Sequence, residues 1–132
     1  MSAEANVALA ERFFDAVQRR DPDGVRAVVA PDIVLWTNVS PEMGVDDVIG
    51  LMPLMESQVP DFHYENAVRT PTSEGFVEEH DVCGTNPRGE EFRFRLCAIG
   101  VVDGGRIASI REYADAGDMS KVGIIVPAPE TA

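Results

Sequence analysis

Hydrophobic and polar positions alternate most regularly in the last third of the chain, from Phe76 to Asp115. Three runs rich in Val, Phe, Ile and Tyr are separated by the short turn sequences NPRG and DGG. Such runs, broken by Gly, Pro and Asn, are typical of antiparallel strands joined by tight turns. Charged residues recur at every second position, as in a strand with one buried and one solvated face. We therefore predict an antiparallel meander over residues 76–115.

Charge pairing predicts the register of the first two strands. If residues 86–88 form a three-residue loop, Glu79 lies opposite Arg95 and Asp81 opposite Arg93 on the same face. Directly opposed charges of opposite sign stabilise a sheet, so this face is expected to be solvated or to lie at an interface. A slip of one residue would turn the arginines inward, which argues against the alternative register.

The opposite face of the meander is then predicted to be buried. It carries an apolar set with one glutamate and one histidine: Glu78, His80 and Val82 on the first strand, and Leu96, Phe94 and Phe92 on the second. On the third strand, Glu112 lies between Ile110 and Ala114, and alternation places it on this buried side. A carboxyl group there should have a raised pKa, because burial disfavours its charged form.

Helical periodicity precedes the strands. Apolar residues at three- and four-residue spacing predict an amphipathic helix over residues 6–19, and Asp21-Pro22 begins a short second helix over about 23–29. Residues 33–37 and 62–70 read as strands. Asp46 is expected to cap a third helix that runs to about Gln58, with Gly50 and Pro53 bending or breaking it.

The resulting order is helix, helix, strand, helix and four strands, which is an α+β fold. A curved antiparallel sheet would wrap around helices that cannot fill it completely. We expect a single domain with its core at about residues 4–115 and a C-terminal tail over 116–132. The apolar stretch from Gly123 to Pro127 could cap a pocket mouth, pair with a partner subunit or fray.

The net charge of −12 argues against nucleic-acid binding, which requires a basic surface. No apolar run approaches the ~18 residues of a membrane span, and the first residues do not read as a signal segment. We therefore expect a cytoplasmic protein without nucleic-acid or membrane partners. In the predicted register Cys83 and Cys97 lie on different rungs and opposite faces, which disfavours a disulfide. His63 and His80 stand apart in the sequence, so no metal site is expected.

Three segments resemble the SnoaL-like branch of the nuclear transport factor 2-like superfamily. They are ERFFDAVQRRDPDGVRAVVAPDIVLW near the start, EEHDVCGTNPRGEEF in the middle and DGGRIASIREYAD near the end. The resemblance implies a cone-shaped barrel whose curved antiparallel sheet wraps around three N-terminal helices. It also implies a homodimer packed through the sheet. The same cone serves isomerases, cyclases, epoxide hydrolases and non-catalytic binders, so the fold does not settle the function.

Two groups of relatives can be compared position by position. Ketosteroid isomerases use an Asp base with a Tyr and a protonated Asp, and the matching positions are Thr37, Phe13 and Phe94, where all three groups are missing. The resemblance therefore does not imply steroid isomerisation by that constellation.

Limonene epoxide hydrolases activate water with an Asp that falls on Glu112. Their first-strand Tyr and Asn fall on Trp36 and Asn38, and their Arg-x-Asp pair falls on Glu78 and His80 with a one-residue slip. The carboxylate and the Asn are present, but Tyr and the Arg–Asp pair are replaced. SnoaL-type polyketide cyclases use a carboxylate and a His in one cavity, a pair that Glu112 and His80 would provide.

The sequence thus favours a cofactor-free general acid–base enzyme of the isomerase, cyclase or epoxide hydrolase type, acting on a small hydrophobic oxygenated molecule. The alternatives are a non-catalytic binding module and a dimerisation scaffold with a filled cone. The candidate catalytic residues are Glu112, His80, Asn38 and Glu78. The candidate pocket residues are Trp36, Phe13, Phe14, Met52, Met55, Tyr64, Val82, Phe92, Phe94, Leu96, Ile110 and Ala114.

Overall fold

The computed structural model describes residues 2–126 of the 132-residue chain. Its helices are α1 (Ala3–Gln18), α2 (Pro22–Arg26), α3 (Val45–Gln58) and α4 (Ala116–Ser120). Its strands are β1 (Val29–Thr37), β2 (His63–Pro71), β3 (Gly75–Thr85), β4 (Glu91–Asp103) and β5 (Arg106–Tyr113).

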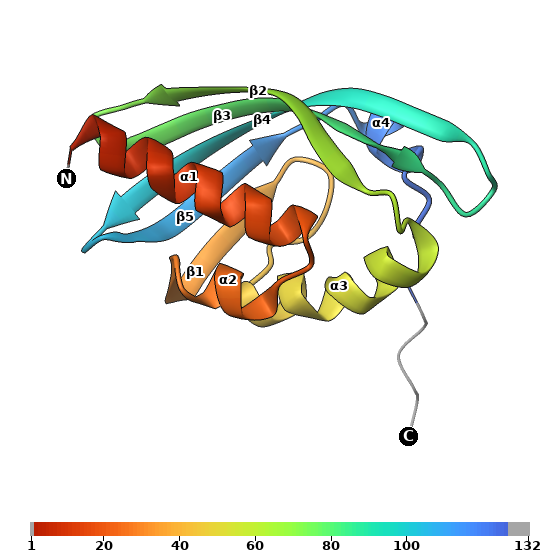
Figure 1. The fold of residues 1–132 in the computed structure, drawn as a ribbon, viewed down its shortest axis with the longest axis horizontal. Helices are drawn as coiled ribbons and strands as arrows, with labels where there is room; N and C mark the ends of the chain where they lie inside the picture. The colour runs from red at the N-terminus through yellow and green to blue at the C-terminus, as the bar shows by residue number, and fades with distance from the viewer. Residues whose placement is uncertain (1, 127–132) are drawn as a thin grey trace.

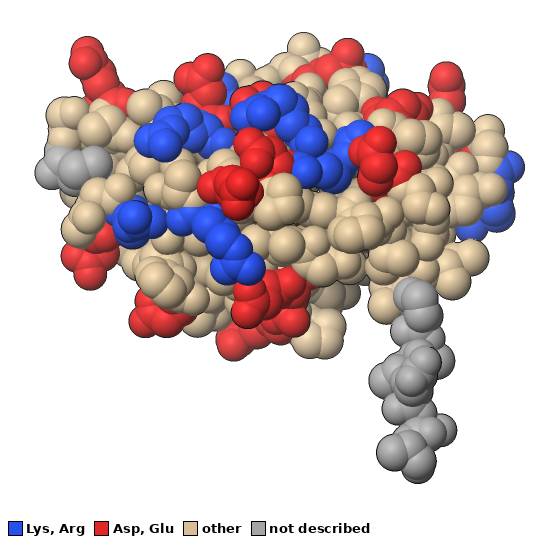
Figure 2. All heavy atoms as spheres, turned by 60° about the horizontal axis from the view of Figure 1, so that its bottom comes forward, with Lys and Arg blue, Asp and Glu red and all other residues tan. Residues whose placement is uncertain are grey.

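The strands form one curved sheet in the order β1-β5-β4-β3-β2, and α1, α2 and α3 cover its inner face (Figure 1). Only the β1–β5 pair among the described strands is parallel. The fold is α+β, as predicted. On the side that brings α2 and α3 forward, acidic and basic side chains are interspersed (Figure 2). Within residues 2–126, no helix has both the length and the hydropathy that a membrane crossing requires.

The predicted register of β3 and β4 is wrong by two residues. Asp81 pairs with Arg95, and Cys83 pairs with Arg93. The connection is five residues long because the buried side chain of Asn86 organises it: its Oδ1 accepts hydrogen bonds from the backbone N–H groups of Arg88 and Glu90, each at 3.0 Å. An even shift leaves the alternation between the two faces unchanged, so Glu78, His80 and Val82 lie on the buried face, as predicted.

Two helix boundaries also differ from the prediction. The second helix ends at Arg26, because β1 already begins at Val29 and runs through Pro31. A proline without an N–H is tolerated there because β1 is an edge strand. The third helix begins after Gly44, whose N–H donates to the Asp47 carboxylate at 2.8 Å, and it continues through Pro53 without a break.

Arg20 joins the end of α1 to the segment that connects α3 with β2. Its guanidinium donates to the backbone carbonyls of Gln18 at 2.8 Å, Pro60 at 2.8 Å and Phe62 at 3.1 Å, and it pairs with Glu56 at 2.7 Å. These contacts tie the C-terminal end of α3 and the segment that follows it to the end of α1.

The two cysteines lie on the outer face of the sheet and not on opposite faces. Cys83 is opposite Arg93, and Cys97 is opposite Glu79, several rungs away along the strands. Both thiols are free.

We predict that the close packing of Phe76 on Gly100 makes Gly100→Ala destabilising. Phe76 is fully buried, and a Cβ at Gly100 would lie 2.2 Å from the Phe76 ring. Forcing that ring aside should lower the free energy of unfolding by about 1–3 kcal/mol, measured by urea denaturation. Gly50→Ala is the matched control: its Cβ would meet nothing within 4 Å, and in a helix this change should stabilise by about 0.5–1 kcal/mol. Equal stability of Gly100→Ala and the wild type would contradict the close contact between Phe76 and Gly100.

Candidate functional site

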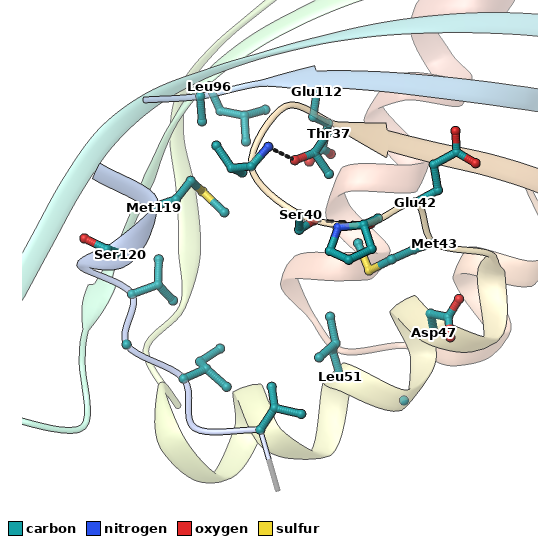
Figure 3. A pocket seen from close by; sticks show the side chains of 18 of the residues that line it. Thr37, Ser40, Glu42, Met43, Asp47, Leu51, Leu96, Glu112, Met119 and Ser120 are labelled. Carbon is teal, nitrogen blue, oxygen red and sulfur yellow. Dashed lines mark hydrogen bonds between the residues drawn. The ribbon is translucent and has the colours of Figure 1, made fainter. Parts of the chain in front are cut away.

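A cavity lies between the inner face of the sheet, the helices α1 and α3, and the segment that follows β5. Its inner chamber has a volume of about 210 Å3 and its outer chamber about 870 Å3. The two chambers share lining residues, among them Thr37, Leu51, Leu96, Glu112 and Met119, so they form one continuous space. Figure 3 shows Glu112 and Thr37 reaching into it from the sheet, opposite Leu51 of α3, while Met119 of α4 lines another side of it.

The half-buried carboxyl group of Glu112 lies where the two chambers meet. Its strand position is fixed by β1, since Glu112 pairs with Thr37 and its carbonyl accepts a hydrogen bond from the Asn38 N–H at 3.3 Å. Among the described residues no side chain or backbone group donates to its carboxylate. Burial without such a partner raises the pKa of Glu112 to about 7. This carboxyl group therefore changes its charge near neutral pH.

Glu112 belongs to a row of paired residues that crosses the whole sheet. From β2 to β1, the row reads Arg69, Glu78, Ala98, Glu112 and Thr37. Directly paired residues point to the same face, so both glutamates are on the inner face with the fully buried Ala98 between them. Two strand spacings separate their Cα atoms, which is about 10 Å.

Glu78 has partners that Glu112 lacks. It is fully buried, and its carboxylate accepts a hydrogen bond from Arg69 Nε at 2.6 Å and lies 2.7 Å from His80 Nδ1. His80 is also fully buried, and its Nε2 has no hydrogen-bond partner among the described residues. Neither Glu78 nor His80 lines a chamber. This corrects the expectation that His80 and Glu112 project into one cavity.

Tyr64 lies between His80 and the inner chamber. Its ring lines the chamber and stacks on the His80 imidazole, with ring centroids 4.1 Å apart. Burial first, and then the negative charges of Glu112 and Glu78, raise the pKa of Tyr64 well above its usual value. The phenol therefore stays protonated and remains a hydrogen-bond donor. The sequence predicts Tyr64 as a residue that lines the pocket, but nothing in the sequence indicates that its ring covers His80.

Most of the other predicted pocket residues line the cavity. The inner chamber includes Phe13, Phe14, Met52, Met55, Val82, Phe94 and Leu96, and the outer chamber includes Ala114. Phe92 and Ile110 are instead buried in the core and line neither chamber.

The two first-strand candidates lie elsewhere. Trp36 is opposite Arg111 on the outer face, and its ring packs on Tyr113 with centroids 5.2 Å apart. Asn38 is exposed, and its carboxamide bonds to both backbone groups of Ala114, accepting from the N–H at 3.1 Å and donating to the carbonyl at 3.0 Å. Asn38 thus extends the β1–β5 pairing and does not orient a ligand in the cavity.

The segment after β5 forms part of the cavity wall, whereas the sequence predicts it only as an apolar tail. Met119, Val122 and Ile124 line both chambers, and Val126 lines the outer one. The Gln58 side chain holds this segment in place: its amide donates to the Ile125 carbonyl at 2.8 Å and accepts from the Ile125 N–H at 2.7 Å. Of the proposed capping stretch, Pro127 lies outside the described residues.

One cluster of potential metal ligands is present on the outer face, away from the cavity. The side chains of His63, Glu65 and Cys83 bring one ligand atom each within 4.8 Å of one another, a proximity that sequence spacing did not indicate. Arg93 already forms an ion pair with Glu65, and burial first, then the hydrogen bond to Glu65, raises the pKa of the Cys83 thiol to about 11. Both features oppose metal binding, because a thiolate and a free carboxylate are the forms that bind metals.

Comparisons with known proteins agree with this architecture. The model of the family described as SnoaL-like domain matches residues 10–110. A candidate polyketide cyclase from Xanthomonas campestris has a TM-score of 0.79 at 20% identity, covering 92% of this chain and 99% of that one. An LEH-like epoxide hydrolase from M. tuberculosis has a TM-score of 0.74 at 25% identity, covering 90% and 89%. A candidate hydroxylase from Streptomyces galilaeus has a TM-score of 0.76 at 19% identity, covering 98% and 91%. No protein of curated function matches the sequence.

We predict that Glu112 makes the protein less stable as pH rises from about 5 to 8. Its folded-state pKa of about 7 exceeds the usual value of 4.5, so the folded state holds an extra proton between these values and loses that stabilisation as pH rises through 7. Glu112→Gln should remove this dependence. The difference in unfolding free energy between the wild type and the variant should therefore change by about 1–3 kcal/mol between pH 5 and pH 8. Urea denaturation at both pH values measures it. Glu42→Gln, at an exposed rim position, is the control, and equal pH dependence of wild type and Glu112→Gln would contradict the assignment.

Proposed function

This chain belongs to the SnoaL-like domain family, and from that premise we propose that it is a general acid–base enzyme of the isomerase, cyclase or epoxide hydrolase type. Its substrate would be a small hydrophobic oxygenated molecule held in the inner chamber, with Glu112 as the proton-transferring group. The observation that carries the proposal is a carboxyl group without a hydrogen-bond partner among the described residues, in an apolar cavity, with its pKa raised to about 7.

A pKa near the working pH suits a group that must both take and return a proton. In epoxide hydration, Glu112 would take a proton from water as the water oxygen bonds to an epoxide carbon and the ring C–O bond breaks. The protonated carboxyl would then return the proton to the alkoxide. In isomerisation or cyclisation, the same group would remove a proton from carbon and deliver it to another atom of the substrate. Each cycle leaves the carboxyl group in its starting state.

Tyr64 is the polar group best suited to assist this step. Its raised pKa keeps the hydroxyl protonated, so it can donate a hydrogen bond to an oxygen on which negative charge develops. The stacked His80, held by Glu78 and through it by Arg69, would fix the ring of Tyr64 in place. We therefore propose a positioning role for these three residues instead of direct contact with substrate.

The comparisons support this class of reaction in outline. Two similar proteins are described as a candidate polyketide cyclase and an LEH-like epoxide hydrolase, and the second is 25% identical over most of both chains. The alternative is a binding module that holds its ligand unchanged, which the burial of His80 and Glu78 away from the cavity favours. Native mass spectrometry after incubation with candidate ligands separates the two, because a binding module returns the ligand unaltered.

We predict that Glu112→Gln lowers kcat/KM by at least about 100-fold on any substrate that the wild type converts, because general-base catalysis contributes about this much or more. A panel of terpene epoxides, aryl epoxides and β,γ-unsaturated ketones, followed by mass spectrometry of the products, is the assay. Wild-type kcat/KM should rise with pH through about 7 as the carboxylate ionises. Glu79→Gln, on the opposite face of the sheet, should retain activity. Undiminished turnover by Glu112→Gln would reject the proposed role.

We also propose a homodimer formed through the outer face of the sheet. Support comes from the side chains exposed there: Tyr113 is 42% exposed and Val34 43%, and Trp36 packs beside Tyr113. Exposed aromatic and aliphatic side chains of this kind are common at the centres of subunit interfaces.

We predict that Ile99→Arg, which introduces a charge on this face, converts the dimer to a monomer. Ile99 is opposite Arg111 on β5 and Val77 on β3, and a guanidinium there would be buried without a partner in the proposed interface. Sedimentation velocity at micromolar concentration measures the change. Glu11→Arg, at an exposed position of α1, should leave the dimer intact, and a monomeric wild type would refute the proposal.

A further inference from the structure

The charged residues that line the cavity all carry the same sign. Glu112 lies where the two chambers meet, and Glu42, Asp46 and Asp47 stand at the rim of the outer chamber. Among the described residues that line either chamber there is no Lys, Arg or His. A ligand entering this space therefore meets carboxylates and no positively charged side chain.

These carboxylates differ in how far they are already neutralised. Asp46 forms an ion pair with Arg26 at 2.7 Å, and Asp47 accepts the Gly44 N–H at 2.8 Å. Glu42 is exposed, so solvent and salt screen its charge, and it contributes mainly to the attraction of a ligand toward the mouth. Glu112 is the group whose negative charge is least compensated, because apolar walls surround it and no cation contacts it.

The walls of the inner chamber suit a cation that carries alkyl or aryl groups. Phe13, Phe14, Phe62, Tyr64 and Phe94 present aromatic rings to it, and methionine side chains fill much of the remainder. The faces of aromatic rings attract ammonium groups, and polarisable thioethers adapt to varied apolar shapes. An anion of the same shape would be repelled by Glu112 and stabilised by nothing in the wall except the hydroxyl groups.

We propose that the ligand of this cavity is a small hydrophobic amine, tertiary or quaternary, whose positive nitrogen lies against the Glu112 carboxylate and whose apolar part fills the inner chamber. The inference rests on the proposed function for the cavity as the ligand site, and it adds the charge of the ligand. An oxygenated substrate with an amino substituent satisfies both.

Two probes that differ only in charge test this directly. [4-(Hydroxymethyl)phenyl]trimethylammonium and 4-tert-butylbenzyl alcohol have the same shape, with N⁺ in one where the other has carbon. Their affinities are measured by protein NMR titration at pH 8 and low salt. We expect the cation to bind at least tenfold more tightly than the alcohol, and 4-tert-butylbenzoate to bind most weakly.

Variants and pH locate the effect at Glu112. Glu112→Gln should lower the affinity for the cation at least tenfold and change that for the alcohol less than threefold, which also shows that the cavity remains folded. Because the quaternary nitrogen cannot titrate, an affinity that rises from pH 5.5 to 8 reports the protein alone. Tyr64 of β2 lines the same chamber as Glu112 and stays protonated, whereas Glu78 of β3 lies in the same row but is held by Arg69 and His80 outside the cavity. The other titratable groups of the cavity are Glu42, Asp46 and Asp47 of the outer chamber. Glu42→Gln should affect the cation only at low salt.

The inference is overturned if the alcohol binds as tightly as the cation, if the preference survives in Glu112→Gln, or if the cation does not bind at millimolar concentration. Its failure is separate from that of the proposed function. Loss of turnover in Glu112→Gln without a preference for cations would leave the enzyme assignment in place. A preference for cations in a protein whose turnover does not need Glu112 would support the cationic ligand and reject the proposed catalytic role of Glu112.

Discussion

The burial of two carboxyl groups on one row of the sheet is the constraint on which the rest of this structure depends. A buried carboxylate must be compensated or must bind a proton, because burial strongly disfavours its charge. Glu78 is compensated by Arg69 and His80 and can be sealed inside the core. Glu112, two strands away, has no such partner among the described residues, and it is placed where a cavity reaches it. The same residue type thus holds the fold in one position and is available to a ligand in the other.

The sequence predicts which side chains lie on the inner face of the sheet, because in a strand this depends only on whether a residue is at an odd or an even position. Alternation placed Glu78, His80 and Glu112 on the inner face, and a register error of two residues left that result unchanged. The error arose because charge pairing alone could not distinguish Arg93 from Arg95 as the partner of Asp81. The longer loop is specified by the buried side chain of Asn86, and its burial depends on contacts with distant parts of the chain, including the Lys121 carbonyl.

The depth of each inner-face residue was not predictable, because it depends on neighbours from other strands and helices. His80 was expected in the cavity, but Tyr64 arrives from β2 and Phe14 from α1 to cover it. The compensating Arg69 also comes from β2, where no local pattern connects it to Glu78. Glu112 could be identified because its strand ends beside the cavity, where the covering layer is made by the weakly patterned segment after β5 and not by another strand.

A cavity of this kind is itself costly to the fold. Side chains that line a chamber of about 210 Å3 have fewer packing partners than those of a close-packed core, which weakens the packing of the fold. Water can relieve little of that cost, because it needs several polar partners and the inner chamber offers mainly Glu112, Thr37 and Tyr64. An apolar ligand that fills the chamber restores the lost contacts, and one that also compensates Glu112 removes the second penalty. The chamber and the uncompensated carboxyl group would therefore both be stabilised by the proposed ligand, which supports the interpretation of the cavity as its binding site.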